Sequence, residues 1–166
     1  HRAPLTLLQQ INLLEACEGI PFHELSLQVF SEVLTDKLIQ PILEGSGAHL
    51  IKLDLKDCLL VTDTTIRRIL EYCPNLMYLN LRAKNKVQGI KGKFTKLVFL
   101  DVSDCLNFTS ITIDAPQLTT LNAENCQQLH SLKTQSLLLR ELNVMGCIAL
   151  KESGIMALTT FAGNLQ

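Results

Sequence analysis

One apolar phrase recurs five times over the last two thirds of the chain, and it constrains the fold more than any other feature. Its frame is L-x-x-L-x-(L/V/A)-x-x-C, followed by an apolar residue three positions after the cysteine. The copies begin at Leu50, Leu76, Leu97, Leu118 and Leu139, and Leu165 is placed to begin another. Such a period indicates a chain that stacks one structural unit on the next, because each unit buries its apolar side only against a neighbour.

The pattern is typical of a leucine-rich-repeat solenoid, and we predict an α/β fold over residues 48–166. Within a copy, Leu50, Leu53 and Leu55 alternate as in a short strand with one buried face. We expect these strands to stack in parallel as a concave sheet whose exposed face binds another molecule.

The return path of each repeat should vary with repeat length. The first copy runs from Leu50 to Asn75, which is long enough for a helix capped by Thr62-Asp63, and residues 150–158 match that helix in the last copy. The middle copies are shorter, and 111–113 and 132–134 are predicted to be brief extended segments. We therefore expect a convex side of mixed helical and extended character.

Residues 1–47 differ from the repeats and are predicted to form an N-terminal helical cap. A first helix is indicated by apolar residues at helical spacing, with Gly19 as its stop. These residues are Leu5, Leu8, Ile11 and Leu14. A second helix is expected from about Phe22 to Leu34, and a short third segment is broken by Pro41, Gly45 and Gly47.

The six cysteines of the chain follow the repeat rather than a ligand or disulfide pattern. Cys105, Cys126 and Cys147 recur in phase with the leucines, and no C-x-x-C pair occurs. We interpret them as small apolar residues tucked into the turn after each strand, reduced and intracellular. Neither a metal site nor a cofactor is predicted.

The run L-x-x-L-x-L-x-x-C-x-x-V-T-D, with the exit Cys73-Pro74-x-Leu76, resembles the cysteine-containing leucine-rich repeat. That class is best known from F-box/leucine-rich-repeat proteins, which recruit substrates to cullin ubiquitin ligases. The resemblance implies a substrate-recruiting adaptor as one function. The second repeat departs from it by placing Lys84 in the cysteine position, and we expect Asn85 to replace it by a one-residue shift, since a buried lysine is costly.

Two weaker resemblances bear on partners. Residues 20–34 are similar to the opening of an F-box, so they are either a degenerate adaptor-binding helix for a cullin-ligase component, with Phe30 in contact, or part of a plain cap. Irregular, short, cysteine-bearing repeats also resemble those of effectors that intracellular bacteria translocate. That resemblance implies action on a host protein in the host cytosol.

Alternation along the strands predicts which side chains lie on the concave face. From the first row we select Lys52, Tyr78, Phe99, Thr120 and Glu141; from the second, Asp101 and Asn122; from the third, Arg82, Glu124 and Met145. The second row is Asp or Asn in every repeat, so it is either a structural ladder or a set of binding residues. Tyr78 and Phe99 are the anchors we predict for a protein partner, because aromatics dominate interfaces.

Charge is unevenly placed along the repeats. Residues 72–100 contain neither Asp nor Glu, whereas Asp101, Asp104, Asp114 and Glu124 follow them. The basic stretch within those residues consists of Arg82, Lys84, Lys86, Lys91, Lys93 and Lys96. It is either a solvated segment or a basic patch that binds an anionic lipid or other acidic surface.

No catalytic constellation is found. The four histidines do not pair with cysteines or carboxylates at ligand spacing, and no nucleophile-elbow, P-loop or dinucleotide motif occurs. Net charge is −1, which gives no general attraction to nucleic acid or membrane. We therefore predict a non-enzymatic protein-binding module, with the ligase adaptor and the anionic-surface binder as alternatives.

Overall fold

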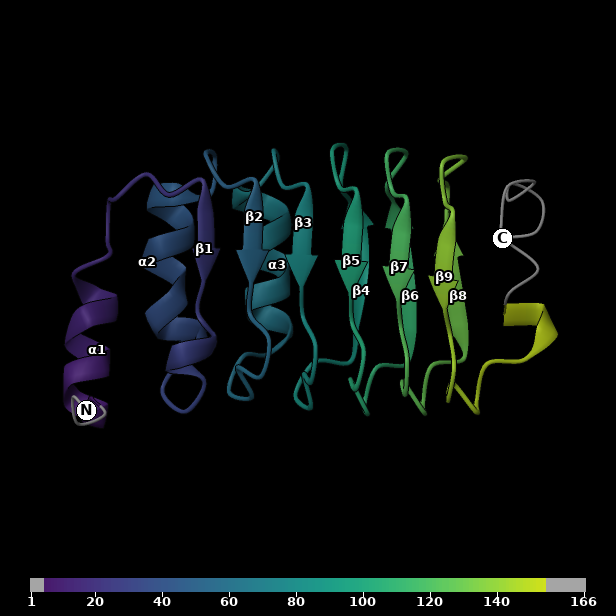
Figure 1. The fold of residues 1–166 in the computed structure, drawn as a ribbon, viewed down its shortest axis with the longest axis horizontal. Helices are drawn as coiled ribbons and strands as arrows, with labels where there is room; N and C mark the ends of the chain where they lie inside the picture. Colours follow the sequence, from purple (N-terminus) through teal and green to yellow (C-terminus); the bar gives the residue numbers. More distant parts are fainter. Residues whose placement is uncertain (1–4, 155–166) are drawn as a thin grey trace.

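The computed structural model describes residues 5–154, which form a parallel-strand β-solenoid of the leucine-rich-repeat kind (Figure 1). Six parallel strands make one long sheet, in the order β1-β2-β3-β5-β7-β9. They are β1 (Glu24–Ser26), β2 (Lys52–Asp54), β3 (Tyr78–Asn80), β5 (Phe99–Asp101), β7 (Thr120–Asn122) and β9 (Glu141–Asn143). The stacked parallel solenoid predicted from the leucine period is confirmed.

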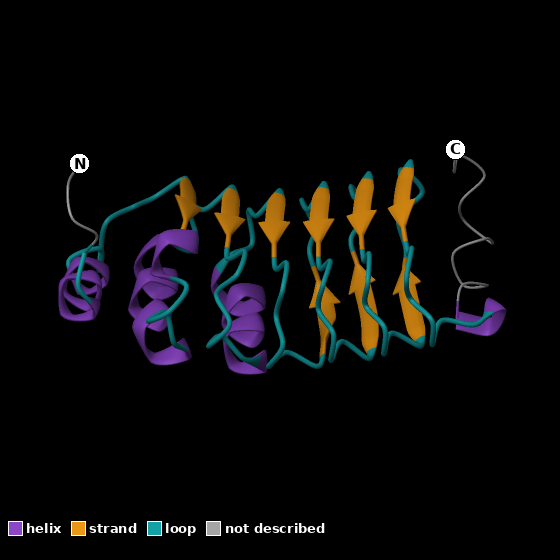
Figure 2. Cartoon of the chain, turned by 60° about the horizontal axis from the view of Figure 1, so that its bottom comes forward, coloured by secondary structure: helices purple, strands orange, loops and turns teal. Residues whose placement is uncertain are grey.

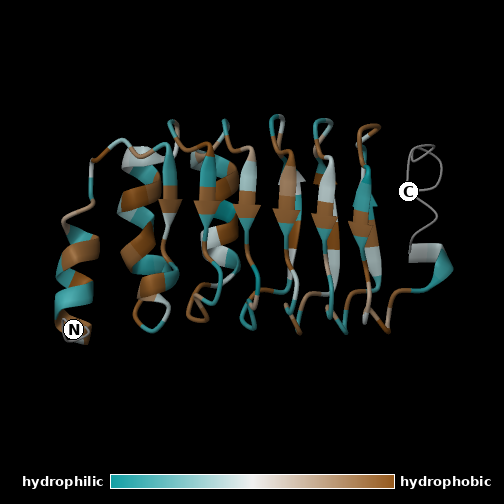
Figure 3. Ribbon diagram, in the orientation of Figure 1, coloured by the Kyte–Doolittle hydropathy of each residue, from teal (hydrophilic) through white to brown (hydrophobic). Residues whose placement is uncertain are grey.

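The leucine frame sets the register of this sheet. Leu53 pairs with Leu79, Leu79 with Leu100, and Leu100 with Leu121, so that one leucine of each of the four central strands enters the same fully buried row. The flanking strand residues are polar or partly exposed in most strands, although Asn80 is buried, and this leaves a hydrophobic band within the strands (Figure 3). A slip of one residue would expose every leucine of the row, and the register is therefore strongly specified.

A repeat that we did not predict precedes Leu50. Residues 22–34 were expected to be helical, but β1 pairs in parallel with β2, with Leu25 opposite Leu53, and a 3₁₀ turn spans Gln28–Phe30. Leu27 and Phe30 are buried in the same core as Leu55 and Cys58. The segment is thus a further copy of the repeat, in which phenylalanine takes the cysteine position.

The helix of this first repeat is α2 (Asp36–Ser46), which runs through Pro41 without a break. Our prediction of a broken segment was wrong. Ile39, Ile42 and Leu43 are buried against the core, and their burial outweighs the loss of one backbone hydrogen bond at the proline.

The N-terminal helix α1 (Leu7–Glu15) begins with a capping box formed by Thr6 and Gln9. It lies beside α2 at the end of the solenoid (Figure 1). Leu14 is fully buried, whereas Leu5 and Leu8 of the predicted apolar face are exposed. The helix therefore covers the end of the core with few of its leucines and presents the others to solvent.

The second layer changes from helices to strands along the axis (Figure 2). Behind β1 and β2 lie α2 and α3 (Asp63–Tyr72). Behind the shorter repeats lies a three-stranded parallel sheet of β4 (Gly89–Lys93), β6 (Ser110–Asp114) and β8 (Ser131–Thr134). These shorter repeats have room for an extended return but not for a helix as long as α3. Of the helix expected within residues 150–158, the structure describes a helical start at residues 152–154; residues 155–158 and Leu165 lie outside the described residues.

Four of the buried thiols form a hydrogen-bonded row after the long sheet. Each donates to the carbonyl oxygen at the same place in the preceding repeat. The pairs are Cys58 Sγ to Leu27 O (3.4 Å), Cys105 Sγ to Leu81 O (3.1 Å), Cys126 Sγ to Val102 O (3.0 Å) and Cys147 Sγ to Ala123 O (3.0 Å). These carbonyls directly follow their strands, and the thiols supply them with donors inside the core.

Lys84 occupies the same row, and our prediction that Asn85 would replace it was wrong. The Lys84 side chain is fully buried, and its Nζ donates to the carbonyl oxygens of Leu55 and, at 3.1 Å, Arg82, while Asn85 is exposed. Val87 is buried three residues later, as Val61 is after Cys58. A shift to Asn85 would break that spacing, so the lysine stays in place and its ammonium replaces the thiol as donor.

Candidate protein-binding face

Tyr78 and Phe99 lie side by side on the solvent face of the long sheet. They are direct partners across β3 and β5, and their rings are parallel within 2° with centroids 4.5 Å apart. Both are half-buried. On the other side of Tyr78, the Nζ of Lys52 lies 5.0 Å from the ring centroid. A cation and two rings thus form one continuous stack, and such contacts stabilise by about 0.5–1.5 kcal/mol each.

The same row continues past Phe99 with shorter or charged side chains. Thr120 pairs with Phe99, and Glu141 pairs with Thr120. The Thr120 hydroxyl donates to Glu141 Oε2 at 3.3 Å. A shallow hollow opens over Thr120, lined by Phe99, Asn122, Glu141 and Asn143 among others. We selected most of these residues from the sequence but did not predict the hollow. The short Thr120 between the longer Phe99 and Glu141 in the same row could have indicated it.

The Asp/Asn row closes the turns after the strands. Asp101 Oδ1 accepts from the Ser103 backbone N–H at 2.8 Å, and Asn122 Oδ1 accepts from that of Glu124 at 3.1 Å. Asn122 Nδ2 also donates to Asp101 Oδ2 at 3.4 Å. Of the two interpretations of this row, the structural ladder describes what these side chains do.

The third row lies at the end of the strands and is mixed in charge. Arg82 is exposed and ion-paired with Asp104 at 2.9 Å. Glu124 accepts from Asn143 Nδ2 at 3.1 Å. Met145 is 65% exposed after the last described strand. The row therefore forms a polar margin around the stack, with one apolar residue at its far end.

The basic stretch is not one surface. Lys84 is buried, and Arg82 belongs to the long-sheet side. Lys91 and Lys93 lie on β4 of the second sheet, where Lys93 is 3.6 Å from Asp114. Lys86 is exposed, and Lys96 is exposed and donates to Asn75 Oδ1 at 2.7 Å.

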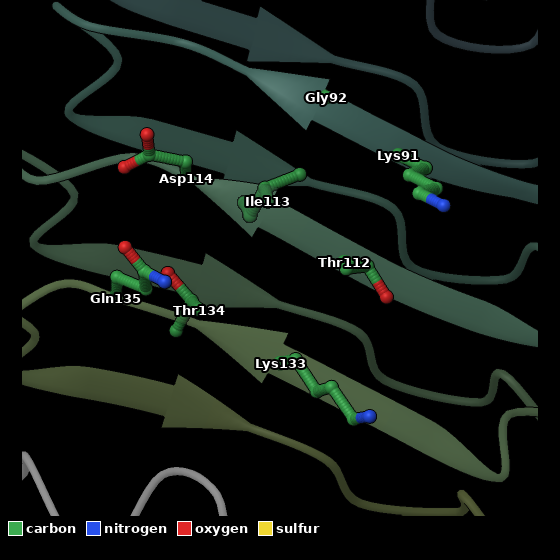
Figure 4. A pocket seen from close by; sticks show the side chains of 8 residues that line it. All are labelled: Lys91, Gly92, Thr112, Ile113, Asp114, Lys133, Thr134 and Gln135. Carbon is green, nitrogen blue, oxygen red and sulfur yellow. The ribbon is translucent and has the colours of Figure 1, made fainter.

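A smaller basic pair on the second sheet was not predicted. Lys91 and Lys133 flank Thr112 on neighbouring strands, at the margin of a shallow pocket (Figure 4). The chain thus distributes its cations around the solenoid, because consecutive residues of one repeat pass along both sheets.

Burial keeps the thiols protonated. It raises the pKa of the Cys58 thiol to about 11 and the pKa values of Cys105 and Cys126 to about 12. These groups are hydrogen-bond donors at neutral pH and not nucleophiles. Burial also lowers the pKa of the Lys84 ammonium. Within residues 5–154 no cluster of three His, Cys, Asp or Glu side chains is arranged to hold a metal ion.

Phe30, expected to contact a ligase component, is a core residue. In its segment the large apolar side chains that reach solvent are Ile20, which is 44% exposed, and Val29, which is 76% exposed. The exposed leucines of the N-terminal region lie instead on α1, where Leu8 is 67% exposed. Across the described part of the chain, no helix combines the length and apolarity needed to cross a membrane.

No protein-family model and no curated protein matches this chain. Among solved structures, it is similar to a chain of the crystal structure of the Rad7 and Elc1 complex in yeast, with a TM-score of 0.61 and 19% sequence identity. The match covers 82% of this chain and 40% of that chain, so the present sequence spans less than half of its structural neighbour. At this identity the likeness is one of fold, and it agrees with a repeat solenoid.

Proposed function

We propose that this protein is a non-enzymatic interaction module that holds a protein partner on the solvent face of its long sheet. The observation that carries the proposal is the Tyr78–Phe99 pair, two half-exposed rings stacked at 4.5 Å in the middle of the sheet. Large aromatic side chains on an open face are typical interface anchors. The polar margin around them supplies hydrogen-bonding groups at the rim of the same surface.

Affinity capture followed by measurement with the recovered partner tests this proposal. Tyr78→Ala and Phe99→Ala should each weaken that partner by about 1–2 kcal/mol, or roughly 5- to 30-fold in Kd. Lys133→Ala, an exposed change on the second sheet, is the matched control and should leave Kd unchanged. Circular dichroism must show that each variant is folded. Unchanged Kd in both aromatic variants would remove the long-sheet face as the binding surface.

A second candidate, a substrate-recruiting adaptor of a ubiquitin ligase, is supported by the fold shared with a chain of the Rad7–Elc1 complex. Such an adaptor needs a second surface for the ligase component. The exposed leucines of α1 are the candidates for it, because Leu7, Leu8 and Leu13 are all largely open to solvent. Phe30 is not a candidate for this contact, since its ring is in the core.

Co-purification with Elc1 distinguishes the adaptor from the simple module. The adaptor should retain Elc1, and Leu8→Glu should abolish retention while Val29→Glu, a comparably exposed apolar position on another element, should not. If the wild-type protein retains no Elc1, the adaptor candidate falls and the binding module stands. The long sheet would bind the ubiquitination substrate if the protein is an adaptor, and the protein partner if it is a simple binding module.

We further propose a reducing, intracellular setting and membership of the cysteine-containing class of repeats. Both are supported by the row of thiols that donate to strand carbonyls, a role that oxidation would end. Alkylation of the denatured protein isolated from cells should find all six cysteines free. The bacterial-effector hypothesis stays a prediction of the sequence; it would place a host cytosolic protein on the same face.

A further inference from the structure

The row of side chains that crosses the long sheet has one layer missing. From β2 to β9 it reads Lys52, Tyr78, Phe99, Thr120 and Glu141, one residue per strand in direct register. Parallel strands are about 4.8 Å apart, close to the spacing at which flat groups stack. Lys52, Tyr78 and Phe99 fill three successive layers as cation, ring and ring. Thr120 is too short to fill the fourth.

The missing layer is a slot with two different walls. One face of the Phe99 ring is covered by Tyr78, and the other looks into the hollow over Thr120. The opposite wall is the exposed carboxylate of Glu141, which the Thr120 hydroxyl holds by a hydrogen bond of 3.3 Å. Phe99 and Glu141 are two strands apart, about 9.6 Å at the usual spacing. The hydrogen bond from Thr120 holds the Glu141 carboxylate close to the empty layer, so a planar group resting on the ring would meet the carboxylate at its edge.

The charge around the slot favours a cation. Besides Glu141, the same side of the sheet carries Asp101, at the end of β5, and Glu124, two residues after β7. Lys52 is separated from the slot by both rings, and Arg82 is neutralised by Asp104. Arg140 is exposed but precedes the strand, at the rim. The π face of Phe99 attracts positive charge as well.

We infer that the slot receives an arginine side chain of the partner, an assignment that deepens the proposed binding role and rests on it. The guanidinium stacks on the open face of Phe99 and donates from its N–H fork to the Glu141 carboxylate. Both contacts need a flat cation, because the ring requires a plane and the carboxylate accepts two parallel N–H bonds. A lysine ammonium makes the ion pair but not the stack, and a neutral planar group makes the stack but not the ion pair.

Titration of the protein with N-acetyl-arginine amide tests the assignment, with the Thr120 methyl and Phe99 ring signals followed by NMR. One side chain alone should bind with Kd on the order of millimolar. The citrulline analogue, which has the same shape without the charge, should bind at least about tenfold more weakly, and the lysine analogue should fall between them.

Two variants and a matched control locate the site. Glu141→Gln should weaken the arginine probe by about fivefold or more, and Thr120→Phe, which fills the empty layer, should abolish the saturable shifts. Glu24→Gln makes the same substitution in the same row on β1, at the other end of the sheet, and should change nothing. Equal binding of arginine and citrulline probes, or full binding by Glu141→Gln, overturns the assignment.

This result is separable from that of the binding proposal. If the recovered partner depends on Tyr78 and Phe99 but is indifferent to Glu141→Gln, the module is right and the arginine slot is wrong. If the partner is indifferent to the aromatic variants as well, the binding face itself is wrong. Loss of partner binding with Glu141→Gln, together with the probe titration, supports both.

Discussion

At the scale of single residues, Lys84 places an ammonium group in a row otherwise made by thiols. Its acceptor, the Leu55 carbonyl, occupies the place that the Leu81 carbonyl has for Cys105. The charged donor makes stronger hydrogen bonds than a thiol, but its desolvation costs several kcal/mol. The two effects oppose each other, and their balance is open to measurement.

We expect Lys84→Met to leave the free energy of unfolding at about pH 7 within about 1 kcal/mol of wild type, or to raise it. Methionine keeps the volume and removes the buried charge, at the loss of two hydrogen bonds to carbonyls. Lys84→Ala, which also leaves a cavity, should cost about 2–4 kcal/mol. Urea denaturation gives both values. A loss above about 2 kcal/mol in Lys84→Met would show that the ammonium is net stabilising.

The same variant should change the alkaline limb of stability. The Lys84 pKa is lowered by burial in the folded protein and is about 10.4 in the unfolded chain. Between these values the unfolded state binds more protons, so this group makes stability rise with pH. Thiols such as Cys126 have pKa values raised by burial, and they make stability fall above about pH 8.5. Lys84→Met should therefore lose more stability than wild type as the pH rises from the lowered pKa of Lys84 toward about pH 10.4. Parallel slopes would contradict the buried position of the charge.

Ala83 directly precedes the cysteine position of its repeat, and its backbone has a positive φ, which alanine rarely adopts. The equivalent residues Asp57, Asp104, Asn125 and Gly146 also have positive φ, and Ala83 has φ 61°. Alanine is strained there, whereas glycine is not. Ala83→Gly should raise the free energy of unfolding by about 0.5–1 kcal/mol. Thermal or urea denaturation measures the change. Ala123→Gly, at a buried position outside that conformation, is the control and should lower it.

At the scale of elements, the first turns of α2 and α3 are each tied to the next repeat. Asp36 of α2 accepts from the Thr62 backbone N–H at 3.0 Å and from the Thr62 and Thr65 hydroxyls at 2.7 and 2.5 Å. Asp63 of α3 accepts from the Gln88 backbone N–H at 3.0 Å in the same manner. Adjacent return segments are thus joined through carboxylates as well as through apolar packing.

Asp36→Asn should lower stability and flatten its acid dependence. Burial alone would raise the pKa of Asp36, but the hydrogen bonds from Thr65 and Thr62 outweigh it, and the pKa is lowered in the folded protein. Its contribution is therefore present above about pH 4 and is lost as pH falls through the lowered value. The variant should lose about 1–2 kcal/mol at about pH 7, and the difference from wild type should shrink below about pH 4 in urea denaturation. A difference that stays constant with pH would contradict this role.

The elements that could be predicted were those fixed by the leucine frame. The first repeat was missed because Leu25, Val29, Phe30 and Val33 have helical spacing, which a three-residue strand followed by a 3₁₀ turn also produces. Asn85 was wrongly expected in the cysteine position because only the desolvation cost of burying the Lys84 ammonium was weighed. The spacing of three residues between Lys84 and the buried Val87 fixes the lysine in that position instead. Tyr78 and Phe99 could be found from strand alternation. The parallel stacking of their rings depends on side-chain rotamers, so the empty layer beside Phe99 could not be derived from the sequence.

At the scale of the whole molecule, the solenoid winds each repeat through both sheets, and it separates charges that are close in sequence. Of the basic stretch, Lys84 is buried, Arg82 and Lys93 have carboxylate partners, and Lys96 donates to Asn75. The exposed pair Lys91 and Lys133 comes from two different repeats on the second sheet. Two such lysines contribute about 1 kcal/mol each to binding at an anionic surface.

We therefore expect no stable binding to anionic vesicles at physiological salt. In sedimentation with vesicles containing phosphatidylserine, the bound fraction should equal that with neutral vesicles, because about two surface lysines give too little energy to hold a protein of this size. Binding to a protein partner on the long sheet should depend on ionic strength only as far as the Glu141 ion pair is screened, and Lys91→Gln with Lys133→Gln should leave both its Kd and that dependence unaltered. If partner affinity instead falls steeply as salt rises, and that dependence disappears in the double variant, the second sheet is a binding surface in its own right and the distribution of cations around the solenoid serves it.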